Sequence, residues 1–153
     1  MAKDISAYST RQYGMTIIEI TVIIVVLAVL ITISVSATLF SLARANDSEK
    51  MSDITALASL LEAHHYTKGK YPLLTDIQTG SVKGVTPEML SAPGQESANT
   101  LVASSTPTLQ QYGYVTFDQS DTACSSGAQC GVRFKLYWQG DQDKAVHVVS
   151  SIK

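Results

Sequence analysis

The sequence predicts an α+β fold in which one long N-terminal helix packs, through its second half, on a small antiparallel sheet. The N-terminal third contains an unbroken apolar run that passes into an amphipathic stretch. The C-terminal third contains three short segments rich in β-branched and aromatic residues, separated by turn sequences. The chain has 153 residues and a net charge of −2, which fits a single folded domain.

Composition divides the chain into three zones: residues 1–14, residues 15–42 and residues 43–153. The first is short and mostly polar, the second is apolar, and the third has the composition of a water-soluble domain with one modest core. The slight acidity and the lack of a basic run give no electrostatic support for a nucleic-acid partner.

The apolar run has the length of a membrane span. Ile20 to Phe40 is 21 residues, and a helix of that length covers about 31 Å, close to the hydrocarbon thickness of a bilayer. A buried core helix is the alternative, but the run is apolar on every face and long for that role. A secretory signal fits poorly, because its apolar core has about 7 to 15 residues and is followed by a cleavage site.

The orientation of this span is predicted from the cysteines rather than from the basic residues. Two basic residues precede the span and two follow it, so the charge bias is nearly tied (Lys3, Arg11, Arg44 and Lys50). Cys124 and Cys130 favour an extracytoplasmic C-terminal domain, because a lone disulfide persists in an oxidising compartment.

The junction between the first two zones carries a specific pattern. Gly14, Met15 and Thr16 are followed by two apolar residues, by Glu19 and by the apolar run. With the short charged leader before it, this arrangement resembles the class III signal of type IV pilins and pseudopilins. The resemblance is strong over residues 11–42. It continues more weakly over residues 56–72, whose ending, YTKGKYP, is similar to the end of the pilin helix.

The resemblance implies a maturation and assembly route. A prepilin peptidase would remove residues 1–14 by cutting between Gly14 and Met15, and Met15 would be N-methylated. Most members of the family have Phe at that position, so Met15 departs from the commonest choice. Thr16 and Glu19 would set the register of assembly. The partners implied are the membrane before assembly, the assembly platform with its motor ATPase, and other copies of the chain in a helical surface filament for adhesion, motility or uptake.

The position of Glu19 has a physical explanation within this scheme. A carboxylate in a membrane helix costs about 2.5 to 3.5 kcal/mol on insertion scales, so such residues are usually paired and functional. Cleavage after Gly14 would create a free α-amine on Met15, one helical turn away. That amine can pair with Glu19 of the same chain or of a neighbouring copy, and the second arrangement would set axial register. The alternative is a glutamate that reaches interfacial water.

The apolar helix departs from many Gram-negative pilins in one respect. Those pilins carry a proline inside this helix, where the present chain has Ser36, and Ala28 occupies a common glycine position. Ser34, Ser36 and Thr38 can bond back to the preceding turn but are not strong helix breakers. A continuous helix from about Met15 to His65 is therefore expected.

The second half of the helix carries a predicted core stripe, with polar residues opposite. The stripe consists of Met51, Ile54, Leu57, Ala58, Leu61 and His65, and the opposite side of Asp53, Ser59 and Glu62. Gly69 and Pro72 are expected to end the amphipathic helix near residue 70, because glycine suits a left-handed cap and proline cannot continue a helix.

The remainder is predicted as a connector followed by a sheet. Residues 71–111 form the loop between helix and sheet, irregular from residue 73, with one helical turn from Pro87 to Leu90 capped by Thr86. The sheet covers residues 112–152, with strands at Tyr112–Phe117, Gly131–Trp138 and Ala145–Ile152. In the second strand, Val132, Phe134, Leu136 and Trp138 share one face.

The chemistry-bearing residues favour structural roles. Cys124 and Cys130 are not in the Cys-x-x-Cys spacing of a redox site, and they resemble the disulfide that many pilins carry near the C-terminus. His64 and His65 point about 100° apart on a helix, which is poor geometry for zinc. No cofactor or metal is expected. Four turn aspartates are weak calcium candidates, by analogy with major pseudopilins: Asp118, Asp121, Asp141 and Asp143.

Three functional hypotheses remain open at the sequence level. The first is a pilin that assembles into a surface filament, and the second is a pseudopilin of a type II secretion system. The third is a membrane-anchored binding module that forms no filament. An enzyme is not expected, since the sequence has no motif for nucleophilic catalysis and one small core.

Overall fold

The structure, a computed structural model, describes residues 14–95, 99–127 and 129–152. The predicted leader, apart from Gly14, lies outside the described residues. The chain divides into two compact units, one ending at Leu39 and one comprising Phe40–Lys153. The first is the N-terminal unit and the second is the head.

Helix α1 (Ile17–Lys68) is continuous over 52 residues and contributes to both units. The expectation of an unbroken helix is confirmed, including across the polar residues 46–48. Gly69 follows its last residue with a φ of +76°, and its N–H donates to the carbonyl of His65 at 2.8 Å. Glycine adopts this left-handed conformation without a steric penalty, so the predicted helix end is also confirmed.

The connector between helix and sheet contains more structure than its sequence predicts. It holds the short helix α2 (Leu74–Gln78), the 3₁₀ turn η1 (Glu88–Leu90) and strand β1 (Leu101–Val102). The turn at Glu88 is confirmed, but the N-cap position falls on Pro87 rather than on Thr86, and no side chain caps the turn there. Elements this short carry too few residues to display a periodic pattern, which explains why α2 and β1 were missed.

Over the described residues the sheet has five strands, and its three longer strands lie where the sequence predicts them. These are β2 (Tyr112–Phe117), β4 (Arg133–Gln139) and β5 (Val146–Ser150), paired antiparallel in the order β2-β4-β5. The two-residue strands β1 and β3 (Ala123–Cys124) both pair with β2. Because β1 runs parallel to β2, the sheet is mixed rather than purely antiparallel.

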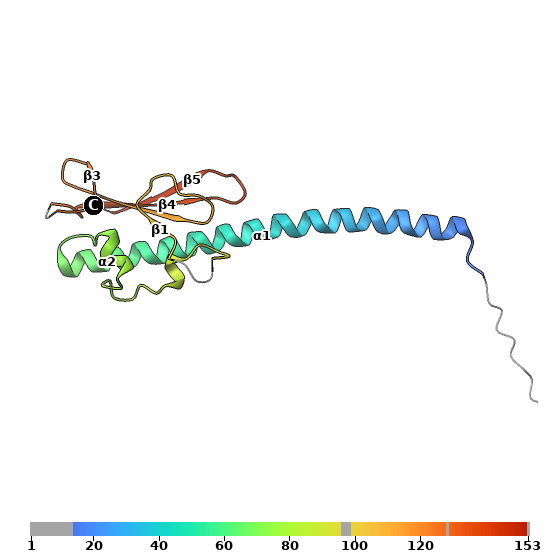
Figure 1. Cartoon of the computed structure of the whole chain (residues 1–153), viewed down its shortest axis with the longest axis horizontal. Helices are drawn as coiled ribbons and strands as arrows, with labels where there is room; N and C mark the ends of the chain where they lie inside the picture. The colour runs from blue at the N-terminus through green and yellow to red at the C-terminus, as the bar shows by residue number, and fades with distance from the viewer. Residues whose placement is uncertain (1–13, 96–98, 128, 153) are drawn as a thin grey trace, which may run out of the picture. The chain divides into compact units, whose positions relative to one another are not determined.

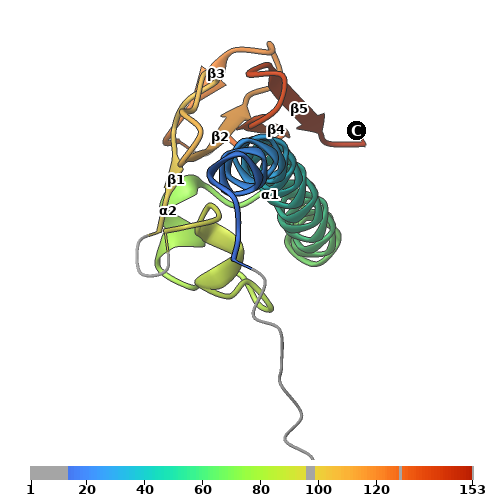
Figure 2. The ribbon, with the colours of Figure 1, turned by 90° about the vertical axis from the view of Figure 1, so that its right-hand side faces the viewer.

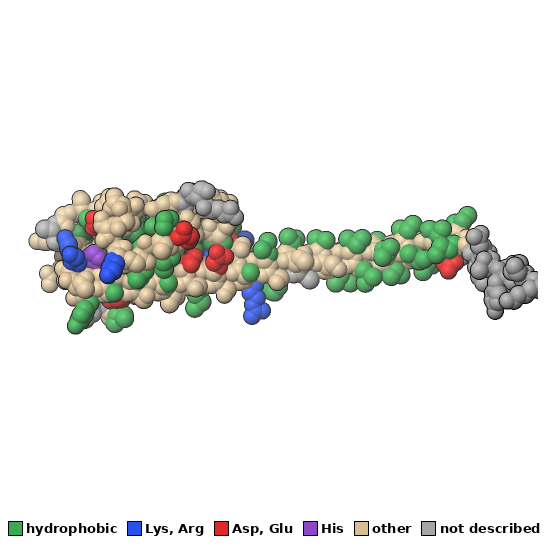
Figure 3. Space-filling view, turned by 90° about the horizontal axis from the view of Figure 1, so that it is seen from below, with side chains coloured by type: hydrophobic (Ala, Val, Ile, Leu, Met, Phe, Trp, Pro, Cys, Tyr) green, Lys and Arg blue, Asp and Glu red, His purple; other side chains and the backbone are tan. Residues whose placement is uncertain are grey.

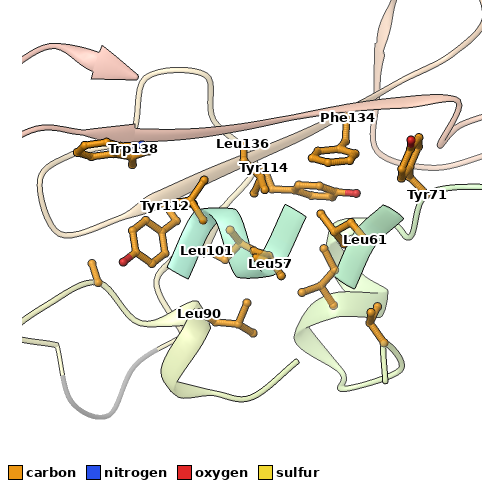
Figure 4. Packing of buried hydrophobic residues seen from close by; sticks show 14 residues of the cluster. Leu57, Leu61, Tyr71, Leu90, Leu101, Tyr112, Tyr114, Phe134, Leu136 and Trp138 are labelled. Atoms are coloured by element: carbon orange, nitrogen blue, oxygen red, sulfur yellow. The ribbon is translucent and has the colours of Figure 1, made fainter. Parts of the chain in front are cut away.

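The head places α1 against one face of the sheet and the connector against another side of the helix (Figures 1 and 2). Ile54, Leu57 and Leu61 of α1 are completely buried. They face aromatic and aliphatic side chains of β2 and β4, while Leu90 and Leu101 approach from the connector (Figure 4). The α+β architecture predicted from the sequence is therefore present, with a single core around the second half of α1.

The sequence assigns several residues in the second half of α1 to the wrong face of the helix. Met51 was expected in the core stripe but is 63% exposed, whereas Lys50 is buried. Asp53 and Glu62 were expected on the outer side. Instead the Asp53 carboxylate accepts from the hydroxyl of Tyr112 at 3.1 Å, and that of Glu62 from the hydroxyl of Tyr71 at 2.8 Å. Tyrosines on the sheet and connector carry hydroxyls that need acceptors when buried, so they bring polar helix residues inward.

The predicted inner face of the second long strand is correct except at its start. Phe134, Leu136 and Trp138 are buried, but Val132 precedes β4 and is 41% exposed. Gly131, just before it, has a φ of +88° and lies against the backbone of Tyr71, where a side chain would clash with the Tyr71 carbonyl. This glycine turns the chain just before β4 begins at Arg133. The alternating pattern in the sequence includes Val132, which lies in this turn, so the pattern predicts a strand that begins before the actual one.

Candidate functional site

The predicted processing segment lies immediately before and within the first turn of α1. Gly14 and Met15 precede the helix and are exposed. A Cβ added at Gly14 would meet no atom within 4 Å. The fold therefore places no steric demand for glycine at this position, so a glycine requirement there would have to come from a partner.

Thr16 has a local role that the sequence pattern already contains. Its hydroxyl accepts a hydrogen bond from the N–H of Glu19 at 3.3 Å, and its carbonyl accepts from Ile20 at 3.2 Å. A threonine three residues before a glutamate is the signature of a helix N-cap. Thr16 was predicted as an assembly residue, and the geometry adds that it starts the helix. A cap search of the sequence would have found this role.

Glu19 stands in the first turn of α1 with its side chain exposed. A carboxylate there interacts favourably with the positive end of the helix dipole. Among the described residues, the ion pairs are Lys50–Asp141, Arg133–Asp121 and His147–Asp143, so Glu19 has no charged partner inside this part of the chain. Its charge remains available to a group outside the described residues, such as a new α-amine or a second copy.

The N-terminal unit exposes apolar side chains along its helix. Every side chain described from Gly14 to Leu39 is exposed, and aliphatic residues cover the face seen in Figure 3. Among the described residues, α1 is the one helix long and apolar enough to cross a membrane. Soluble proteins rarely leave such a surface uncovered, so this unit requires an apolar partner or solvent.

The hydroxyls in this unit are satisfied by the helix itself. The side chains of Thr32, Ser34 and Ser36 each donate to the carbonyl four residues earlier, at 2.8 to 3.1 Å. Thr21 and Thr38 also bond to the preceding turn. Because these hydroxyls need no water, the helix can enter a non-aqueous environment without an unsatisfied donor.

A polar cluster that was not predicted joins α1 to the turn between β4 and β5. Lys50 is 2% exposed, and its ammonium donates to the Asp141 carboxylate at 3.0 Å and to the Gln139 carbonyl at 3.1 Å. Asn46 donates to the same carboxylate at 2.8 Å, and Asp47 accepts from the N–H of Asp141 at 2.6 Å. Although partial burial raises the pKa of Asp141, the hydrogen bonds from Asn46 and Lys50 outweigh it, and the pKa is lowered.

The spacing of Lys50 contained a signal for its burial. Lys50, Ile54, Leu57 and Leu61 recur at intervals of four, three and four residues, so they lie on one helix face. A lysine on such a face is usually read as a solvated residue that ends the stripe. Its burial depends on the carboxylate of Asp141, 91 residues further along the chain, and sequence periodicity cannot reveal such a pairing.

Cys124 and Cys130 form a disulfide, as expected, with their Cα atoms 5.9 Å apart. Cys124 lies on β3 and Cys130 precedes β4, so the bridge closes the segment between β2 and β4. The hydroxyl of Thr116 on β2 donates to the carbonyl of Cys124 at 2.7 Å, which fixes the loop to the sheet.

The four calcium candidates fall into two separate pairs with other partners. Asp118 accepts from the N–H groups of Ser120 and Thr122, and Asp121 pairs with Arg133 at 3.2 Å. Asp141 belongs to the Lys50 cluster, and Asp143 bonds to His147 at 3.0 Å. Within residues 14–95, 99–127 and 129–152, no three metal-ligating side chains converge. The structure therefore does not bring these aspartates together.

The two adjacent histidines also diverge. His65 stacks on Tyr71 with ring centroids 4.3 Å apart. His64 lies on another side of α1, next to Lys68. Their separation follows from the helical geometry predicted above.

Comparison with known proteins adds no relative: no protein-family model, no curated protein and no solved structure matches the chain.

Proposed function

We propose that this chain is the structural subunit of a type IV pilus. In this proposal it enters the membrane as a prepilin, is cleaved after Gly14, is N-methylated at Met15 and assembles into a helical surface filament. The observation that carries the proposal is the junction at residues 14–19. A glycine with no steric role, a helix cap and a charged first turn open a helix whose first part is apolar and exposed.

The exposed apolar helix is consistent with a subunit that is first inserted in the membrane and later assembled into a filament. Before assembly, lipid would cover its aliphatic side chains, since no described residue of the N-terminal unit buries them. After assembly, the equivalent helices of other copies would cover the same surface. Hydroxyls bonded to the helix backbone suit both environments.

Glu19 supplies the link between cleavage and assembly. It has no charged partner among the described residues, and removal of the leader would create a positive α-amine one turn away on Met15. In a bundle of staggered helices, that amine can pair with Glu19 of a neighbouring copy. Such a buried pair specifies register more than it adds stability.

The head supports an assembly role rather than a catalytic one. His65 stacks on Tyr71, Asp118 stabilises a turn and Asp141 pairs with Lys50, so these side chains hold elements of the fold together. We propose no reaction for this chain, no cofactor and no nucleic-acid partner. The pseudopilin hypothesis shares every feature above, and the two differ in whether a surface filament forms.

The decisive experiment is mass spectrometry of the mature N-terminus from cells that express the full chain with a prepilin peptidase. The expected product begins at Met15 and carries one additional methyl group, and the Gly14→Leu variant remains uncut. A protein that still begins at Met1 under these conditions would overturn the proposal.

Electron microscopy of material sheared from the cell surface then separates pilin from pseudopilin, since only the pilin yields surface filaments. The Glu19→Ala variant should insert into the membrane normally but form few or disordered filaments. Normal filaments in that variant would contradict the role assigned to Glu19.

A further inference from the structure

The side of α1 that faces the connector carries two shallow hollows of opposite charge. The hollow near the start of the head has a volume of about 230 Å³ and is lined by Glu49, Glu88 and residues 91–95. The hollow near the end of α1 has a volume of about 320 Å³, and its charged lining consists of Lys68 and Lys83, with His64 beside them. Both lie within the head.

Among the described residues, none of Glu49, Glu88, Lys68 and Lys83 belongs to an ion pair. The Glu88 carboxylate has a hydrogen bond with the Thr86 side chain, which lowers its pKa and keeps it charged. Asp76 is an acidic group that acts on His64 beside the basic hollow, and its carboxylate accepts the N–H of Leu73 at 3.0 Å. Burial and the positive charges of Lys68 and Lys70 lower the pKa of His64 against the opposing effect of Asp76, which indicates a positive surrounding.

The two hollows lie on one surface of the head, at different heights along α1. The basic hollow is lined by Leu60, Ala63, His64 and Thr67 of α1, and at about 100° per residue Leu60 and Thr67 point in nearly the same direction as Glu49. Figure 3 shows a face of the head with acidic side chains toward its start and basic side chains toward its far end. Nineteen residues separate Glu49 from Lys68, which corresponds to about 28 Å along a helix.

From this arrangement we propose that the acidic hollow of one copy docks on the basic hollow of another copy in the same filament, with the two heads shifted along α1. This copy is a different neighbour from the one that pairs with Glu19, because the Glu19 pair needs a shift of about one helical turn. The partner of this surface is therefore a second copy of the chain. The inference rests on the proposed function, because membrane insertion by the same end of α1 holds neighbouring copies parallel.

Parallel copies explain why a shift is required. Without a shift, Glu49 would face Glu49 and Lys68 would face Lys68 of the neighbour, and like charges repel. A shift of about 28 Å along the helix brings Glu49 of one copy level with Lys68 of the other. Because the two surfaces in contact differ, the interface is heterologous and can repeat, which builds an open helical assembly instead of a closed dimer.

Disulfide trapping in the full chain tests this contact directly. The two native cysteines are bonded to each other, so a Glu49→Cys/Lys68→Cys variant has two free thiols too far apart to bridge within one copy. After mild oxidation of the sheared, assembled fraction, we expect a ladder of dimers, trimers and longer products, whereas copies still inserted in the membrane cannot adopt the shift and should give little product. Each single-cysteine variant should give several-fold less cross-linked product and nothing larger than a dimer.

Charge reversal provides an independent measurement. Glu49→Lys and Lys68→Glu should each reduce the recovered polymer several-fold, and the double variant should restore it. Lys144→Glu is the matched control, since Lys144 is an exposed lysine on the β4–β5 turn without an ion pair in the described chain. Higher salt should weaken the wild-type assembly, because the Debye length falls from about 30 Å at 0.01 M to about 3 Å at 1 M.

The proposal fails if the double-cysteine variant gives no more product than the single-cysteine variants, or if the double charge reversal does not recover assembly. These outcomes are distinguishable from failure of the proposed function, which is read from the mature N-terminus. A chain that begins at Met15 and forms filaments without the ladder would overturn the docking surface alone. A ladder formed by an uncut chain would support the docking surface and overturn the pilin assignment.

Discussion

The two parts of helix α1 have the same backbone conformation but differ in what surrounds their side chains. From Ile17 to Leu39 the described side chains are exposed and mostly apolar, and the hydroxyls bond to the helix's own carbonyls. From Phe40 to Lys68 the helix buries an apolar stripe and directs polar groups to distant elements. The first part is therefore suited to an environment supplied by other molecules, and the second part makes its environment within the chain.

The comparison also shows where each part obtains its specificity. A helix that is apolar all round has no preferred face, so it packs equally well in many rotations. In the proposed filament, Glu19 would be the group of the N-terminal unit that distinguishes one register from another. In the head, register is fixed several times over, by the core and by the Lys50, Asp53 and Glu62 contacts.

The largest contrast is expected from shortening a leucine in each part. Leu57→Ala removes a completely buried side chain and should lower the free energy of unfolding of the head by about 3 to 4 kcal/mol. Leu30→Ala, at a 54% exposed position, should leave it unchanged. Urea unfolding of the full chain in detergent, followed by the fluorescence of Trp138, measures both. Equal effects would show that the two parts do not differ as described.

The next largest effect concerns the buried ammonium of Lys50. Asp141→Ala leaves this charge without its carboxylate and should cost about 3 kcal/mol. Lys50→Met should cost less, about 1 kcal/mol, because Asp141 is nearer to solvent and keeps its bond from Asn46. If Lys50→Met is the more damaging variant, the buried charge does not dominate this cluster.

The same cluster predicts that the free energy of unfolding of the head falls at acidic pH. The pKa of Asp141 is lower in the folded head than its ordinary value of about 3.9. Its contribution is therefore complete above that value and is lost as pH falls through the folded pKa. Measured between about pH 5 and pH 2, wild type should lose more stability than Asp141→Ala. Parallel profiles would contradict the contribution of Asp141.

A smaller effect is expected from the contact between helix and sheet at Asp53. Tyr112→Phe removes the hydrogen bond to the Asp53 carboxylate and should cost about 1 kcal/mol. Burial first, and then the Asp53 charge, raise the pKa of Tyr112, so its contribution is present below about pH 10 and is lost as pH rises further. Urea titrations at neutral and alkaline pH measure both effects, and the loss above pH 10 should be smaller in the variant.

The smallest effect is expected for a hydroxyl in the N-terminal unit. Thr32→Val removes the bond to the Ala28 carbonyl but keeps the side-chain shape, so the unfolding free energy of the head should change by less than about 0.5 kcal/mol. Circular dichroism in detergent should show unchanged helicity. A loss of helicity would indicate that the hydrogen bond from the Thr32 hydroxyl stabilises the helix, and does not merely give the hydroxyl an acceptor.

The sequence predicted the features that depend on neighbouring residues. Helix length, its end at Gly69, the three longer strands and the disulfide follow from periodicity, from backbone preferences and from a lone cysteine pair. The apolar span follows from composition alone. The candidate processing segment is equally local, since it is recognised from six consecutive residues. The helix cap at Thr16 also follows from local sequence, because Thr16 precedes Glu19 by three residues.

The tertiary structure decided what depends on residues far apart in the chain. Lys50 is buried because Asp141 lies opposite it, and Asp53 and Glu62 turn inward because tyrosine hydroxyls need acceptors. Strands β1 and β3 form because they pair with β2. Each is two residues long, which is too short to show an alternating pattern in the sequence. Burial of polar groups is governed by partners in space, and the sequence order of this chain separates those partners by up to 95 residues.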